Sequence, residues 1–416
     1  MAPALLLSAR AILDSLTDVD SEIRSQWSNP GDIFSLLLLI GGDIIQKALG
    51  QLAGSQLSIA NFHIPLTPVA FSFGWVAYAY SSLTDIVGEG TLMPQIDVPS
   101  QVINCCTGYV RDNRSWILGR VLRDHEKRTR GEQGKVTFRI DVFEGTDQKG
   151  VDSDRVWWVS WLVILLQQIV AALPWMLYGD WSILFVTLCG TIGALATGML
   201  PQWTKEKWAS PRLERGSGKR KVMALTRGNG HSHVMLFVNK GVGWDMEAMA
   251  TSSGEPQRET RYISLLLTGW WTLLLITCSG LHDHTWFLIG VGGLGMLQNI
   301  YVAGSPRPMG SFNIHYTLDS TIISGKKSRR PVDETDNSDT DDNPNPSESV
   351  GGVMGALMEV ERKFPGAGAS LVGVFFPSSL GYEKAKFPFA HERKFWKYAY
   401  KTMEARKREK YDSISK

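Results

Sequence analysis

The chain has 416 residues, with 43 Lys and Arg against 41 Asp and Glu, and a net charge of +2 at pH 7. Its four cysteines exclude a disulfide framework, because two are adjacent and two lie in apolar stretches. The near-neutral mean hydropathy would suit a soluble protein, but it averages very apolar segments with long polar ones. The hydropathy of individual segments must therefore decide between a soluble and a membrane protein.

The first 32 residues predict a cytoplasmic arm. Residues 4–16 have the spacing of a short amphipathic helix that lies on a membrane surface. The start lacks the basic region and the small-residue cleavage site of a secretory signal. We therefore expect the first transmembrane helix to act as an uncleaved insertion signal.

Five uncharged apolar segments predict membrane spans. Each holds 20 to 23 residues without Asp, Glu, Lys or Arg, and about 20 apolar helical residues cross a bilayer core. A weaker sixth segment, residues 33–53, carries Asp43 and Lys47. The five segments are residues 64–83, 156–178, 181–200, 262–281 and 285–304.

The basic residues of the loops predict the topology. Residues 84–155 and 201–261 hold 11 Lys and Arg each, and the tail from residue 305 holds 18. The short connections near residues 54–63, 179–180 and 282–284 hold none. Because positive loops stay cytoplasmic during insertion, we expect both termini in the cytoplasm, in an endomembrane such as the endoplasmic reticulum rather than the plasma membrane. If residues 33–53 only dip into the membrane, the N-terminus lies outside.

These features predict an all-α transmembrane helical bundle of about six spans, with small α+β cytoplasmic loop regions. Residues 221–238 place two β-rich runs around Gly-Asn-Gly, which predicts a β-hairpin, and residues 136–143 alternate like a strand. Residues 332–348 are acidic, lack Lys and Arg, and predict a disordered linker before a basic helix over 392–410. The predicted order is an amphipathic arm (1–32), a transmembrane hairpin (33–83), a basic loop (84–155), a second hairpin (156–200), the loop with the β-hairpin (201–261), a third hairpin (262–304) and the tail (305–416).

Small and amide residues inside the spans predict helix packing. Gly190, Ala194 and Gly198 recur every four residues, as in closely packed helix pairs. Residues 290–295 match the G-x-G-x-x-G dinucleotide pattern, but they lie in an apolar span that follows no strand, so packing is the prediction. The amides that we expect to join helices are Gln167, Gln168, Gln298 and Asn299.

Ionisable groups at or near the membrane are the candidate catalytic residues. Asp43 and Lys47 lie four apart on one helical face, where they could transfer protons or simply neutralise each other. Carboxylates and imidazoles in the predicted luminal turns suit a zinc ion or a proton relay, although a polar turn between helices needs such residues in any case. These turn residues are Asp180, His282, Asp283 and His284.

Three tryptophans are candidates for a substrate pocket. Trp161, Trp270 and Trp271 lie further into the predicted spans than the others, where they could line a cavity for a lipophilic small molecule. Anchoring at the membrane interface is the alternative that explains the tryptophans as a set.

The sequence predicts no metal site and no cofactor. His231 and His233 alternate on the predicted hairpin and should point the same way, but no third ligand is evident. Walker A, HExxH and nucleophile-elbow sequences are absent. The predicted partners are the lipid bilayer and, for the basic helix at 392–410, anionic lipid headgroups rather than nucleic acid.

Residues 224–238 (ALTRGNGHSHVMLFV) and 355–377 (GALMEVERKFPGAGASLVGVFFP) resemble segments of uncharacterised fungal multi-pass membrane proteins. The resemblance carries no active site. Such families sometimes accompany specialised-metabolite pathways, which implies a lipophilic intermediate as the ligand. Two hypotheses follow: a membrane-embedded enzyme or accessory factor for such an intermediate, or a non-catalytic scaffold or transporter whose loops bind partners.

Overall fold

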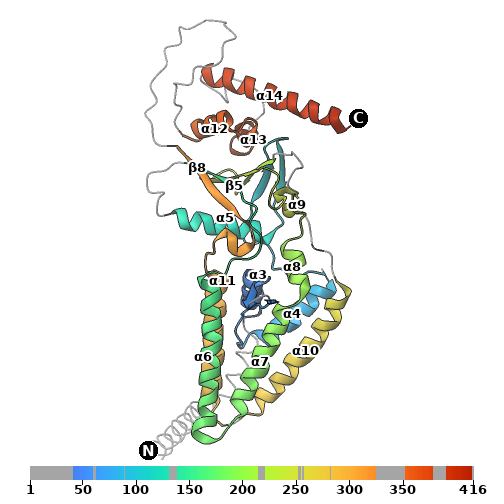
Figure 1. Ribbon diagram of the computed structural model, residues 1–416, viewed down its shortest axis with the longest axis vertical. Helices are drawn as coiled ribbons and strands as arrows, with labels where there is room; N and C mark the ends of the chain where they lie inside the picture. The colour runs from blue at the N-terminus through green and yellow to red at the C-terminus, as the bar shows by residue number, and fades with distance from the viewer. Residues whose placement is uncertain are drawn as a thin grey trace, which may run out of the picture. The chain divides into compact units, whose positions relative to one another are not determined.

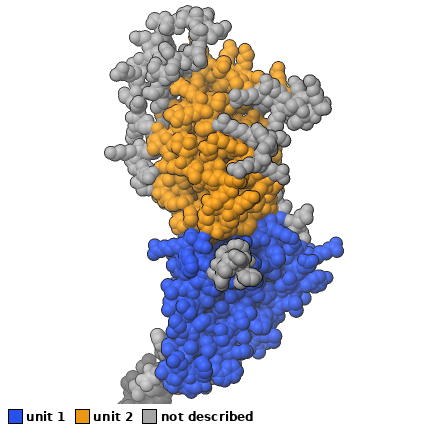
Figure 2. All heavy atoms as spheres, viewed as in Figure 1, with its two compact units in different colours: residues 1–94, 153–207, 254–305 blue, residues 95–152, 208–253, 306–416 orange. Residues whose placement is uncertain are grey.

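The computed structural model describes residues 41–59, 62–88, 90–130, 138–213, 221–251, 254, 257–281, 283–324, 352–377 and 390–414. The predicted N-terminal arm, the acidic linker and His282 lie outside these residues. The chain divides into two compact units (Figure 2). Unit 1 comprises Met1–Pro94, Ser153–Lys207 and Gly254–Ser305, and unit 2 comprises Gln95–Asp152, Trp208–Ser253 and Pro306–Lys416.

The expected all-α bundle of about six spans is wrong. The described chain is mixed α/β, with a six-stranded sheet in unit 2. Three described helices of unit 1 are long and apolar enough to cross a membrane, or four if one bent pair counts as a span. The three helices are α6 (Arg155–Tyr178), α10 (Arg258–Ser279) and α11 (Thr285–Gly304), and the pair, bent by 42°, is α7 (Ser182–Gly198) with α8 (Pro201–Lys207).

In the described part of the first predicted transmembrane hairpin, which begins at residue 41, there is no pair of long helices. The described residues contain α3 (Gly42–Leu52) and α4 (Trp75–Gly88), with 11 and 14 residues, both too short to span. Between them lie a two-stranded hairpin, β1 (Gln56–Ile59) with β2 (Phe62–Pro65), and the non-helical residues 66–74. Residues 67–74 are all buried. They are apolar because protein covers them, and apolarity alone does not distinguish that burial from contact with lipid.

Amide side chains bind the backbone of this extended segment. Gln167 donates from Nε2 to the Phe71 carbonyl (2.7 Å), and Asn299 donates from Nδ2 to the Ala70 carbonyl (3.3 Å). The Ala70 amide donates to Oε1 of Gln298 at 3.2 Å. Because a segment that is neither helix nor strand leaves its backbone groups unpaired, these amides supply the partners that burial demands.

Glycines in α7 and α11 make room for the same segment. A Cβ on Gly295 would lie 1.8 Å from the Phe71 carbonyl oxygen, and one on Gly292 would lie 2.2 Å from the Phe73 ring. A Cβ on Gly190 would lie 2.4 Å from the Phe71 ring. A Cβ at any of these positions would force its neighbour to shift, since real Cβ atoms do not approach so closely. The small residues therefore accommodate the extended segment, whereas the sequence predicted close packing between helices.

Unit 2 is built around one mixed sheet with the strand order β4-β3-β6-β7-β5-β8. β5 pairs with β7 in parallel and with β8 antiparallel, while β6 and β7 form the antiparallel hairpin. The strands come from three segments that the sequence predicted as separate small regions. They are β3 (Gln101–Asn104), β4 (Tyr109–Asp112), β5 (Phe138–Gly145), β6 (Lys221–Thr226), β7 (His233–Asn239) and β8 (Tyr316–Ser324).

Helices cover both faces of this sheet (Figure 1). Alternate residues of β7 face opposite sides, so Leu236 joins the apolar core under the C-terminal helices and Phe237 faces the other side. Every residue of β7 is buried, as in a central strand covered on both faces. One face carries α12 (Gly352–Lys363), α13 (Ala367–Phe375) and α14 (Ala390–Ile414), and the other carries α5 (Trp116–Thr129) and α9 (Met246–Thr251), with a 3-10 turn at Met309–Phe312.

We predict that Gly295→Ala destabilises the protein and that Gly293→Ala does not. The added methyl at 295 meets the Phe71 carbonyl, and overpacking of this kind costs about 1–3 kcal/mol. Nothing lies within 4 Å of a Cβ on Gly293, so that change should be neutral or stabilise by up to about 1 kcal/mol. Thermal unfolding in detergent measures both, and equal melting temperatures would contradict the account.

Candidate functional site

Asp43 and Lys47 do not form a paired site. Asp43 is exposed in the first turn of α3, and Lys47 is half-buried one turn later. Within the described part of the chain, no ion pair joins them. Figure 1 also shows α3 well away from the turn that joins α6 and α7. The two candidate groups of catalytic residues therefore do not converge.

The turn residues cap and stack on the helices. Asp180 accepts hydrogen bonds from the Ser182 amide (3.0 Å) and the Ser182 hydroxyl. These bonds, with the nearby charge of His284, hold the pKa of Asp180 below its usual range. The His284 ring stacks on Tyr178 with centroids 4.3 Å apart, and Asp283 is exposed. Such contacts fix a turn between two helices.

The three candidate tryptophans do not border a substrate-sized cavity in the described structure. Trp271 is 1% exposed and stacks on Trp75 with ring centroids 5.0 Å apart. The cavity beside it holds about 10 Å³, no more than one water needs. Trp270 donates to the Cys189 carbonyl at 3.3 Å, and Trp161 packs against Trp157. Trp271 and Trp161 contribute to the core of unit 1, whereas Trp270 is 39% exposed.

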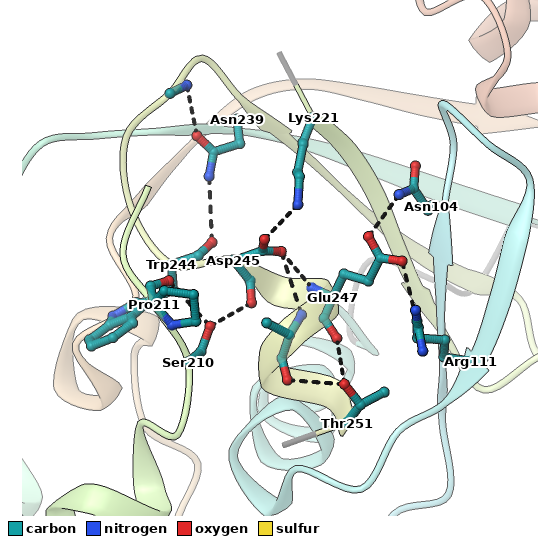
Figure 3. A network of polar contacts seen from close by, with 12 residues as sticks. Asn104, Arg111, Ser210, Pro211, Lys221, Asn239, Trp244, Asp245, Glu247 and Thr251 are labelled. Carbon is teal, nitrogen blue, oxygen red and sulfur yellow. Dashed lines mark hydrogen bonds and ion pairs between the residues drawn. The ribbon is translucent and has the colours of Figure 1, made fainter. Parts of the chain in front are cut away.

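A charged network joins α9 to the sheet of unit 2 (Figure 3). Asp245 accepts a hydrogen bond from the Glu247 amide (3.2 Å) at the start of α9 and pairs with Lys221 of β6. Glu247 in turn accepts from Asn104 of β3 (2.8 Å) and from Arg111 of β4 (3.2 Å). Because both carboxylates have partners on the strands or at the start of α9, the network holds α9 against the sheet.

A second polar cluster is buried between α5 and the sheet. His125 Nε2 lies 2.6 Å from Asp141 Oδ2, and His233 Nε2 lies 3.9 Å from the same oxygen. The three donor atoms all lie within 4.8 Å of one another. The side chains come from α5, β5 and β7, and these residues are 8%, 0% and 2% exposed. The cluster has the composition of a metal site.

Hydrogen bonds set the charge of this cluster. Burial alone would raise the pKa of Asp141, but hydrogen bonds from His125, Thr321 and Arg139 outweigh it and leave the pKa below its usual value. Arg139 Nε lies 2.9 and 2.8 Å from the two carboxylate oxygens, and the Thr321 hydroxyl lies 2.7 Å from Oδ1. Burial lowers the pKa of His233 to about 4, so its ring is neutral at pH 7. Neutral imidazoles and an ionised carboxylate are the forms that bind metal ions.

The sequence found only one member of this cluster. It predicted that His231 and His233 share a face, but β7 begins at His233 and His231 lies exposed in the turn before it. The other two residues of the cluster, His125 and Asp141, are distant from His233 in the sequence. One signal could have indicated the cluster. Asp141 lies among the apolar residues of β5, and a carboxylate that is buried there requires a polar partner.

Unit 2 also has an open cleft of about 800 Å³. Its walls are the β6–β7 turn, the β3–β4 edge and the helices α13 and α14. Arg227 in the turn pairs with Glu126 at 2.6 Å, and the Ser370 hydroxyl donates to the Gly366 carbonyl at 2.6 Å. No pairing of a nucleophile with a base occurs among the described lining residues.

The comparisons with known proteins identify no relative. No family model matches the chain, and no curated protein or solved structure shows significant similarity to it. The resemblance of residues 224–238 and 355–377 to fungal membrane proteins stays a prediction.

We predict that Asp245→Ala destabilises unit 2 by about 1–2 kcal/mol, because it removes both the α9 cap and the partner of Lys221. Asp245→Asn keeps a capping oxygen and should cost less. Chemical denaturation of the two variants measures the difference. Equal stability of the alanine variant and the wild type would show that the network contributes nothing.

Proposed function

We propose that the protein is a membrane-anchored scaffold whose unit 2 binds a protein partner in the cleft. The observation that carries the proposal is the sheet itself. Segments that precede, separate and follow the two helical hairpins all contribute strands to it. The chain outside the helical hairpins therefore forms one folded unit rather than three independent loops, as a scaffold requires.

The pairing of strands from all three segments in one sheet supports a topology of four membrane spans. The chain passes from β5 through α6 and α7 to β6, and from β7 through α10 and α11 to β8. Strands of one sheet must lie on one side of a membrane, so each hairpin has to cross twice or not at all. The bent pair α7 and α8 therefore counts as a span in this proposal. The charge of the sheet-forming segments favours the cytoplasmic side of an endomembrane.

The proposal favours binding over catalysis. The candidate catalytic residues of unit 1 do not converge, and the acids and histidines described in unit 2 mostly pair with one another. The cleft joins apolar residues such as Val110 and Val374 to polar ones, as protein interfaces do. No observation favours an enzyme acting on a lipophilic intermediate.

The basic helix α14 has a limited part in contact with lipid. Trp396 and Ala399 on its apolar face are 0% and 4% exposed, since they pack into the core of unit 2. That face cannot also insert into a membrane. Any contact with anionic headgroups rests on exposed basic residues such as Lys401.

Photo-crosslinking in cells tests the scaffold function. A photoreactive residue replaces Val110 or Val374 in the cleft, and the matched control replaces Leu318, which is 52% exposed on the edge strand β8. We expect both cleft positions to capture the same polypeptide and the control position not to. Capture of no polypeptide above the control, or of a small molecule that the protein converts, would contradict the proposal.

We predict that glycosylation acceptors inserted at residues 179–181 or 281–283 are modified when the protein is made with endoplasmic reticulum membranes. These turns join the two helices of each hairpin, and four spans place them in the lumen. An acceptor inserted at the exposed residues 147–149 before α6 should stay unmodified. The reverse pattern, or modification at only one of the two turns, would contradict four spans.

A further inference from the structure

Beyond partner binding, we infer that unit 2 binds one zinc ion between His125, Asp141 and His233. The donor atoms are the Nε2 atoms of both histidines and Oδ2 of Asp141. Two imidazoles and one carboxylate form a zinc-binding set, and nitrogen donors favour zinc over magnesium or calcium.

The separations of the donor atoms fit this ion. Zinc bonds of about 2.0–2.2 Å place tetrahedral ligands about 3.4 Å apart. The separations from Asp141 Oδ2 to His125 and His233 are 2.6 and 3.9 Å, one shorter and one longer than that value. Side-chain adjustments would seat the ion, because the three donor atoms already lie within 4.8 Å of one another.

The surrounding residues hold Asp141 in position for the ion. The Thr321 hydroxyl donates to Oδ1, and that bond can persist when Oδ2 turns to the metal. Arg139 Nε lies 2.9 Å from Oδ1 and 2.8 Å from Oδ2, so it would keep only its bond to Oδ1. Bonds of this kind orient metal-binding carboxylates. The guanidinium also repels a cation, so we expect micromolar affinity, weaker than that of four-ligand structural sites.

Zinc binding replaces two hydrogen bonds of the metal-free cluster. They are the bond between His125 Nε2 and Asp141 Oδ2 and the bond between the Thr129 hydroxyl and His233 Nε2. A histidine that binds a metal through Nε2 keeps its ring proton on Nδ1, so any proton on His125 Nε2 must leave that atom. The Thr129 hydroxyl, 3.1 Å from His233 Nε2, or a water could supply the fourth ligand.

The burial of the cluster assigns the ion a structural role. With each ligand less than 10% exposed, a substrate cannot reach the metal. The ligands belong to α5, β5 and β7, so the ion would tie the helix to two strands from different parts of the chain. Zinc would thus stabilise the assembled sheet, because it binds the folded form and not the unfolded one.

The test measures zinc binding by the full-length protein in detergent. After the metal is stripped with a chelator, competition against a chromophoric chelator gives the affinity, and elemental analysis gives the stoichiometry. We expect one zinc per chain, a rise in the melting temperature of the wild type, and at least a 100-fold loss of affinity in His125→Gln and His233→Gln. Asp141 is kept, since its removal would leave the buried Arg139 charge without the carboxylate.

His231→Gln is the matched control, because His231 lies two residues from His233 but is exposed. It should bind zinc as the wild type does. Circular dichroism of each metal-free variant establishes that it is folded. Cobalt substitution adds a readout that stability does not affect, since visible bands of tetrahedral Co²⁺ should appear in the wild type and control and be lost in both ligand variants. Wild-type zinc affinity in His233→Gln, or no saturable zinc binding by the folded wild type below 100-fold excess, would overturn the inference.

Discussion

The pairing of β5 with two other strands is the constraint on which unit 2 depends. β5 hydrogen-bonds in parallel to β7 and antiparallel to β8, and the three strands come from segments separated by helical hairpins. A strand forms only where its backbone groups find partners, so none of these segments can complete its structure alone. The sheet therefore forms only when all three segments come together, and the buried histidine–aspartate cluster exists only after β5 and β7 have paired.

Unit 1 depends on a different solution to the same backbone requirement. Its extended residues 66–74 have no strand partners, so amides from α6 and α11 bind their carbonyls and amides. Glycines on α7 and α11 allow the close approach that these hydrogen bonds need. The sequence predicted that these amides join helices. Gln167 and Gln298 do make hydrogen bonds between α6 and α11, and they also bind the backbone of a short segment that has no regular structure.

Local patterns in the sequence predicted the local structure well. Uncharged residues 156–178, 262–281 and 285–304 coincide closely with α6, α10 and α11, and residues 221–238 contain the strands of the β6–β7 hairpin. The sheet could not be predicted, because β5–β7 and β5–β8 pairing joins residues far apart in sequence. Residues 64–83 misled the prediction because burial in protein and contact with lipid select the same apolar residues. The cluster at Asp141 was missed because its three residues lie on three separate elements.

The most direct test of the central claim is disulfide crosslinking between β5 and β8 in membranes. Glu144 and Thr317 are opposite one another in this pair. In a chain with the four native cysteines replaced by alanine, and with a protease site inserted between residues 213 and 221, cysteines at 144 and 317 should keep the two fragments linked after cleavage. Cysteines at 144 and 323 should not, since Ile323 pairs with Arg139 instead. Separate fragments from the first pair, in protein whose helices are inserted, would contradict a single sheet assembled from all three segments.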